Sequence, residues 1–310
     1  MLRTAPFAAL LLAAAPALAA EPETCATVRL AEVGWTDIAA TTGVAVTLLQ
    51  ALGYETKTEL LALPVTFQSL ARGDIDVFLG QWMPTMETLI RPYLESGEID
   101  VVRVNLEGAK YTLATTTTLA DQGLTDFADI AKFKDQLDGK IYGIEPGNDG
   151  NKIIADMIAQ NAFGLGDFKL VESSEQAMLA QAERAVGDKE GIVFLGWEPH
   201  PMNMKLPMTY LAGGDAWFGP GFGGSTVSTA VRAGYVDECP NVGRLLQNLA
   251  FTLPMENEIM GAILDLNEKP EAAAANWISA HPIVIDPWLA GVTARDGGPA
   301  DAAVRAAMGL

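Results

Sequence analysis

The sequence predicts an α/β protein of two lobes, each a mainly parallel sheet flanked by helices. Strand and helix patterns alternate along most of the 310 residues, which is typical of a parallel sheet covered on both faces. Two stretches more than 100 residues apart are also nearly alike. Residues 76–84 and 192–199 each contain an apolar run of strand type that stops at Gly, with Trp just beyond and then Pro. This repeat predicts two similar halves with equivalent loops.

Each half is expected to contain three strands and two helices. In the first half the strands are expected at 28–33, 54–61 and 74–79, and the helices at 38–52 and 65–72. In the second half the strands are expected at 140–144, 169–171 and 191–195, and the helices at 151–161 and 174–186. The loops 34–37 and 146–149 therefore both follow a first strand. Trp82 and Trp197 both follow a third strand.

The connections between the halves predict the domain boundaries. Segments 101–104 and 111–115 are expected to cross into the second lobe, and 209–211 is expected to return. Lobe one then consists of 20–107 plus 211–310, and lobe two of 108–210. Two crossings make a two-segment hinge, which permits closure around a ligand.

The N-terminus predicts export. Arg3 precedes an apolar run at 6–15, and Ala17-Leu18-Ala19 is a cleavage sequence, so residues 1–19 are expected to be a signal peptide cleaved near Ala19. The residues before Cys25 do not form a lipid-attachment sequence. No later apolar run approaches the ~20 residues that span a bilayer, so no membrane insertion is expected. We expect a monomer in a bacterial periplasm.

Charge and cysteine content narrow the function further. The net charge of −19 argues against binding to nucleic acid or anionic membranes. It mildly favours a cationic ligand, although solubility alone explains such acidity. In an oxidising compartment the pair Cys25 and Cys239 suggests a disulfide that closes a loop of more than 200 residues. Two free structural thiols are the alternative.

Three tryptophans are candidate ligand contacts. Trp35, Trp82 and Trp197 are expected on loops at the carboxyl ends of strands, where α/β sheets bind ligands. Gly or Pro beside each argues for a shaped loop, although core packing is the usual fate of Trp. Tyr111 begins a crossing into lobe two. Facing aromatic rings bind a quaternary ammonium through their electron-rich faces.

Two polar residues lie on the loops that follow the first strands. Asp37 can supply the negative charge beside a bound cation, and Asn148 can bond a ligand hydroxyl. Asp37 as a helix N-cap and Asn148 as a turn residue are the alternatives.

Signals for enzymatic chemistry are weak. Residues 219–224 match GxGxxG, but Pro220 and the lack of a clear preceding strand argue against a dinucleotide site. His200 and His281 each precede Pro, and no GxSxG sequence is present. We expect no catalytic residue, no cofactor and no metal site.

Four motifs resemble those of the glycine betaine/choline family of ABC-transporter substrate-binding proteins. They are Gly-Trp-Thr-Asp at 34–37, Gly-Gln-Trp-Met-Pro at 80–84, Glu-Pro-Gly-Asn at 145–148 and Gly-Trp-Glu-Pro-His at 196–200. The resemblance covers about residues 25–295 and implies a type II periplasmic binding-protein fold. It also implies an inner-membrane permease with a cytoplasmic ATPase as partner.

The same resemblance implies the roles of the site residues. Its aromatic box around a trimethylammonium consists of Trp35, Trp82, Tyr111 and Trp197, with Asp37 near the cation and Asn148 near a hydroxyl. It also supports a Cys25–Cys239 bridge.

Choline is the expected ligand. A betaine carboxylate needs a cationic or amide clamp, whereas Asp37 and Glu145 on the predicted loops would repel it. A glycine betaine, carnitine or acetylcholine binder of the same family is one alternative. An exported hydrolase of choline esters and a sensory accessory protein are alternatives from other classes.

Overall fold

A computed structural model describes residues 21–310, so the expected signal peptide lies outside the described residues. The chain forms one mixed sheet in the order β2-β1-β3-β9-β4-β7-β5-β6, with β8 paired to β4. The strands are β1 (Thr27–Glu32), β2 (Glu55–Leu60), β3 (Val77–Met83), β4 (Ile99–Thr116), β5 (Lys140–Tyr142), β6 (Lys169–Val171), β7 (Val193–Glu198), β8 (Met208–Tyr210) and β9 (Gly224–Arg232).

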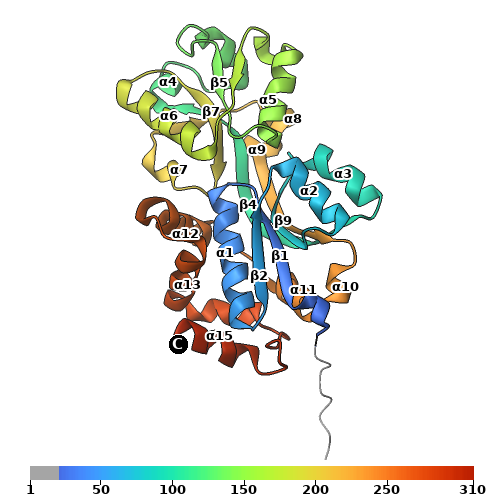
Figure 1. Ribbon diagram of the computed structural model, residues 1–310. Helices are drawn as coiled ribbons and strands as arrows, with labels where there is room; N and C mark the ends of the chain where they lie inside the picture. The colour runs from blue at the N-terminus through green and yellow to red at the C-terminus, as the bar shows by residue number, and fades with distance from the viewer. Residues whose placement is uncertain (1–20) are drawn as a thin grey trace, which may run out of the picture.

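Helices pack around this sheet at both ends of the elongated molecule (Figure 1). They are α1 (Thr36–Ala51), α2 (Leu63–Arg72), α3 (Glu87–Glu95), α4 (Thr117–Asp121), α5 (Asp149–Ala159), α6 (Glu175–Asp188), α7 (Met202–Lys205), α8 (Asp215–Phe218), α9 (Pro220–Gly223), α10 (Tyr235–Glu238), α11 (Pro240–Asn248), α12 (Leu253–Leu266), α13 (Pro270–Ala280), α14 (Ile285–Trp288) and α15 (Ala300–Met308). Figure 1 shows α4–α8 around β5 and β7 at the upper end, and α12, α13 and α15 beside α1 at the lower end.

The α/β alternation in both halves is confirmed, but the expected pair of separate, mainly parallel sheets is not. The pairs of β1 with β2 and β3, and of β5 with β6 and β7, are parallel. The pairs that join these two groups are antiparallel and run through β4 and β9. The sheet is therefore continuous and mixed, because two long strands carry it from one half to the other.

The route between the halves also differs from the expected one. β4 is a single strand of 18 residues that includes both expected crossing segments. The segment expected to return, 209–211, belongs mostly to β8, which pairs with the end of β4 at Ala114–Thr116. The return is made by β9, whose Gly224 pairs with Lys110 and whose Arg232 pairs with Ile99. The pairing of β4, β8 and β9 is ambiguous in sequence because it depends on residues far apart in the chain.

Trp82 and Trp197 lie inside strands rather than on the loops after them. β3 continues through Gly80 to Met83, with an irregularity between Phe78 and Gln81 where it pairs with β9. The sequence pattern predicts that the strand stops at Gly80. A Cβ at this position would approach Cδ1 of Ile38 to 2.7 Å, so glycine here permits close packing of α1.

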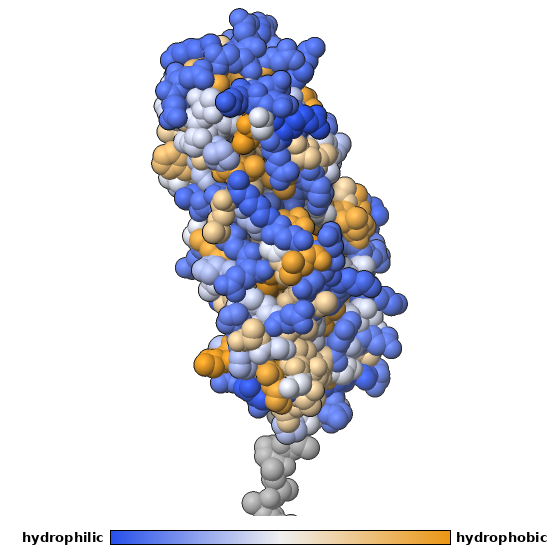
Figure 2. Space-filling model, turned by 90° about the vertical axis from the view of Figure 1, so that its left-hand side faces the viewer, coloured by the Kyte–Doolittle hydropathy of each residue, from blue (hydrophilic) through white to orange (hydrophobic). Residues whose placement is uncertain are grey.

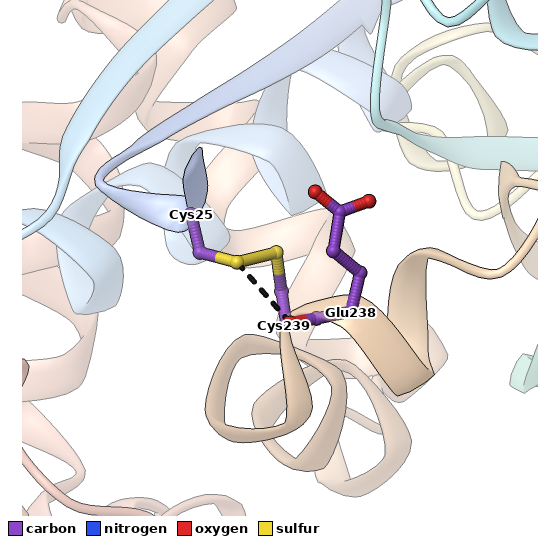
Figure 3. A group of neighbouring side chains, drawn as sticks. All are labelled: Cys25, Glu238 and Cys239. Atoms are coloured by element: carbon purple, nitrogen blue, oxygen red, sulfur yellow. Dashed lines mark hydrogen bonds between the residues drawn. A yellow bond between two sulfur atoms is a disulfide. The ribbon is translucent and has the colours of Figure 1, made fainter. Parts of the chain in front are cut away.

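The disulfide between Cys25 and Cys239 is present and joins the residue two positions before β1 to the residue directly after α10 (Figure 3). Its Cα atoms are 5.6 Å apart, and the bridge spans 214 positions of the sequence. The two sulfurs and the neighbouring Glu238 carboxylate lie close enough together to resemble a metal site. Because both sulfurs are bonded to each other, they are not available as thiolate ligands.

Within residues 21–310, no helix combines the length and apolar character needed to cross a membrane. The face in Figure 2 is mostly hydrophilic, with apolar residues in small scattered groups. Isolated apolar residues on a surface are ordinary.

We expect the double variant C25A/C239A to lose about 2–5 kcal/mol of unfolding free energy, because the bridge closes a very long loop in the unfolded chain. Urea titration of the oxidised parent and the variant measures this difference. An unchanged unfolding midpoint and slope would show that the bridge adds no stability.

Candidate ligand-binding site

A cavity of about 270 Å³ lies where the two halves of the sheet meet. Its lining residues are Trp35, Asp37, Trp82, Tyr111, Ile144, Asn148, Asp149 and Trp197. All six candidate ligand contacts from the sequence are among them. The aromatic members are 4–6% exposed, so nearly all of their surface is withdrawn from water.

The secondary structure explains why distant residues meet here. Trp35 and Asp37 lie at the start of α1, directly after β1, and Trp82 is near the end of β3. Tyr111 in β4 is paired across the sheet with Trp197 in β7. The cavity therefore collects the carboxyl ends of strands from both halves, which is where α/β sheets bind ligands.

The aromatic rings around Tyr111 are inclined to one another rather than stacked. The ring centroid of Tyr111 is 6.0 Å from that of Trp82, with 59° between the planes, and 6.4 Å from that of Trp197, with 82° between the planes. Phe218 of α8 packs edge-on behind Tyr111 at 5.9 Å. The contacts of Tyr111 with Trp197 and Phe218 are edge-to-face, a preferred geometry for aromatic pairs, and they hold the Tyr111 ring in place beside the cavity.

Asp37 is buried with little to balance its charge. It is 2% exposed, and its Oδ2 accepts a hydrogen bond of 3.1 Å from Nε1 of Trp82. Its Oδ1 has no hydrogen-bond partner among the described residues. Burial raises the pKa of Asp37 to about 7, and the nearby Glu175 carboxylate adds to this increase.

The helix-cap interpretation of Asp37 is not supported, because Trp35 occupies the N-cap position of α1 and Asp37 lies in its first turn. The Asp37 carboxylate is directed to Trp82 instead.

Asn148 both caps a helix and supports the cavity. It is the N-cap of α5, and its Oδ1 accepts hydrogen bonds of 3.0 Å from the amide of Asn151 and 2.9 Å from the hydroxyl of Tyr111. A Cβ on Gly150 would lie 2.1 Å from that hydroxyl, so this contact requires glycine there. Asn148 therefore fixes the position of Tyr111 in addition to lining the cavity.

Asp149 was missed as a candidate contact. It is 2% exposed and lines the cavity, and its Oδ2 lacks a hydrogen-bond partner within residues 21–310. Burial raises the pKa of Asp149 to about 6. The repeat held the signal that would have found it: Asp37 and Asp149 both lie in the first turn of the helix after the first strand of a half.

Two further carboxyl groups lie close to this site. Oε1 of Glu145 accepts a 2.9 Å hydrogen bond from Nε1 of Trp35, and burial raises the pKa of Glu145 to about 7. Glu256 at the start of α12 is 2% exposed, and burial together with repulsion from Asp37 raises its pKa well above the usual value. The site is thus rich in carboxyl groups that burial keeps from ionising freely.

The sequence of the chain matches a known protein family, and the fold and the cavity agree with that match. A family described as the substrate-binding domain of ABC-type glycine betaine transport systems matches residues 26–280. The chain belongs to this family. The family resemblance inferred from the motifs is confirmed, and so is the expectation of a binding protein rather than an enzyme, since the family comprises substrate-binding domains.

Solved structures of relatives extend over nearly the whole chain. The structure of an ABC-transporter choline-binding protein in complex with choline has 61% identity and a TM-score of 0.92, covering 93% of this chain and 100% of that chain. An unliganded, semi-closed structure of such a protein has the same identity and coverage and a TM-score of 0.86. These matches confirm an α/β periplasmic binding-protein fold.

A curated relative is more distant. The glycine betaine/carnitine transport binding protein GbuC of Listeria monocytogenes is 30% identical over 167 residues, which are 53% of this chain and 53% of that protein. The match thus spans about half the length of GbuC.

We expect D37N to stabilise the ligand-free protein more at pH 8 than at pH 5. The native pKa of Asp37 is raised from 3.8 to about 7, so the native state holds this proton more tightly and loses stability as pH rises toward 7. Asparagine removes that loss. From pH 5 to 7 the difference amounts to about 2–3 kcal/mol for a protein that stays closed, and opening of the lobes before unfolding lowers it.

Urea unfolding of the parent and D37N at both pH values measures this effect. Most other titrating groups are shared by the two proteins, so their contributions largely cancel in the difference. If the difference between the two proteins is the same at pH 5 and pH 8, Asp37 is not buried in the ligand-free protein.

Proposed function

We propose that the protein is the periplasmic substrate-binding protein of an ABC importer and that it binds choline between two lobes. The observation that carries this proposal is the composition of the cavity wall, with four aromatic rings and two acidic side chains. Among its lining residues from the described chain, none is basic. A quaternary ammonium offers no N–H to an acceptor, and ring faces and carboxylates attract its diffuse charge.

The magnitudes are consistent with this ligand. Each ring face contributes about 0.5–2 kcal/mol to binding a cation, so four faces contribute about 2–8 kcal/mol. Micromolar affinity requires about 8 kcal/mol. The carboxylates of Asp37 and Asp149 supply the remaining attraction, which burial strengthens.

In the proposed complex, Trp35, Trp82, Tyr111 and Trp197 surround the trimethylammonium, and Asp37 lies beside the cation. Asn148 and Asp149 lie at the end of the cavity that receives the hydroxyl. The amide of Asn148 already bonds Tyr111, so it orients the box and contacts the ligand from the same position.

Closure of two lobes brings these walls together. The bounds expected from the sequence put 20–107 plus 211–310 in lobe one and 108–210 in lobe two, joined by a two-segment hinge. The contact of Phe218 with Phe127, at 5.9 Å between ring centroids, extends lobe two to about Gly224, where β9 begins. The higher TM-score to the choline complex than to the unliganded relative supports a closed arrangement of the lobes here.

The proposal includes an extracytoplasmic location and a membrane partner. A signal peptide at 1–19, cleaved near Ala19, delivers the chain as a monomer to the periplasm, where the closed form docks on an inner-membrane permease driven by a cytoplasmic ATPase. The family description as part of an ABC transport system supports this assignment.

Other ligands of the same class fit the cavity less well. Glycine betaine and carnitine carry the same trimethylammonium but also a carboxylate, which Asp37 and Asp149 repel. Acetylcholine lacks the hydroxyl that Asn148 would receive. Hydrolysis of a choline ester needs a nucleophile and a base, and the described lining residues include no Ser, Cys or His.

We expect W197A to weaken choline binding by at least about 2 kcal/mol, or about 30-fold, because one wall of the box is removed. Titration calorimetry with choline measures the affinity, and circular dichroism checks that the variant is folded. W277A is the control, since Trp277 lies in α13 and bonds Glu258 instead of lining the cavity. Equal choline affinity in the parent and W197A would remove Trp197 from the site.

A further inference from the structure

A buried group of hydrogen-bonded side chains outside the cavity joins the two proposed lobes. It consists of Thr36 at the start of α1, Glu175 at the start of α6 and His200 after β7, and we call it the clasp. The three side chains are nearly fully buried, with exposures of 4%, 1% and 2%. None of them lines the cavity as described above. The role of the clasp is therefore separate from direct contact with the ligand.

Glu175 holds Thr36 through both carboxylate oxygens. Its Oε2 accepts a 2.9 Å hydrogen bond from the backbone amide of Thr36, and its Oε1 accepts one of 2.5 Å from the Thr36 hydroxyl. The first amides of a helix have no partner within the helix. The N-cap of α1 is Trp35, whose indole has no acceptor oxygen, so a carboxylate from α6 takes over the capping of α1.

His200 ties the same carboxylate to the opposite wall of the cavity. Its Nδ1 accepts a 3.0 Å hydrogen bond from the amide of Met202, which assigns the proton of a neutral ring to Nε2. Nε2 faces Oε1 of Glu175 at 3.3 Å. The ring of His200 packs edge-on against Trp197, with 5.0 Å between the centroids. His200 therefore links Glu175 to one of the aromatic walls.

The position of the clasp connects it to ligand binding. Thr36 lies between Trp35 and Asp37, which are both lining residues of lobe one. Holding Thr36 against α6 thus fixes these two side chains opposite Trp197 and Tyr111 of lobe two. The hydrogen bonds between Glu175 and Thr36 form only when the lobes are closed, because Glu175 belongs to lobe two and Thr36 to lobe one.

We propose that Glu175 is a positioning residue that latches the closed lobes through Thr36 and so slows the release of choline. This inference rests on the proposed function. A buried, charge-assisted hydrogen bond is stronger than an exposed ion pair, and opening must return the Glu175 carboxylate and the Thr36 amide to water. The contact of Glu175 with Thr36 stabilises the closed complex and does not affect the open, ligand-free protein.

A second contact between the lobes provides the matched control. Lys205 of α7 and Asp265 of α12 form an ion pair whose side chains are 45% and 47% exposed. Exposed pairs contribute little to stability because water and salt screen them. D265N therefore removes a contact across the same two lobes without removing a buried one.

The test is a double-mutant cycle of E175Q and T36V, measured by titration calorimetry and stopped-flow release of choline. We expect E175Q to raise Kd about 10- to 100-fold, mostly through faster release, and T36V to raise it by a smaller factor. In the double variant Kd should rise by less than the product of the two single fold-changes, because both substitutions break the same contact. D265N should change Kd less than twofold. Urea unfolding of the ligand-free variants should match the parent.

Each other outcome overturns a specific statement. If the parent binds choline and E175Q releases it at the parental rate, the latch is wrong and the proposed function stands. If the fold-changes in Kd of E175Q and T36V multiply in the double variant, Glu175 and Thr36 act separately. The proposed role of Glu175 in holding the lobes closed through Thr36 is then also wrong. If E175Q lowers ligand-free stability as much as it lowers affinity, its role is structural. If the parent does not bind choline at all, the proposed function fails and this inference fails with it.

Discussion

The Asp37 side chain is almost fully buried, and its carboxylate accepts a single side-chain hydrogen bond, which Trp82 donates. Isolated buried carboxylates are unfavourable, and proteins normally pair them or keep them protonated. Here the carboxylate borders a cavity whose other walls are aromatic, and Asp149 repeats the arrangement from the other half of the chain. The arrangement becomes favourable when a cation occupies the cavity. In the proposed complex, the aromatic faces, the mixed sheet and the closed lobes all act to place that cation beside Asp37.

The cost of burying the Asp37 and Asp149 carboxylates also explains why the site spans both halves of the molecule. A cavity enclosed by a single lobe would keep its unpaired carboxylates buried whether or not a ligand is present. When the walls come from two lobes, the ligand-free form can open and return these carboxylates to water, which removes much of their desolvation cost. Ligand binding and closure then depend on each other, as expected when a ligand binds one conformation preferentially. The hydrogen bond from Trp35 to Glu145, across 110 positions of the sequence, joins the two proposed lobes.

Much of the fold and the site follows from local patterns in the sequence. Short apolar runs predicted β1, β3, β5 and β7, and helical periodicity predicted the positions of α1, α5 and α6, because these elements depend on short-range patterns. The pairing of β4 with β9 depends on residues more than 100 positions apart and was not predicted. Asp149 was missed because an acidic residue in the first turn of a helix is ordinary. Glu175 was missed because its partner Thr36 is 139 positions away in the sequence.

The central claim is that the cavity requires a positive charge and not only an apolar group of the right shape. The most direct test compares choline with its uncharged isostere 3,3-dimethylbutan-1-ol, in which carbon replaces nitrogen, by titration calorimetry at pH 8. The two ligands have the same shape and the same hydroxyl. Loss of the attraction to four ring faces and two carboxylates predicts that the isostere binds at least about 100-fold more weakly, or by about 3 kcal/mol. Equal affinities would contradict the account.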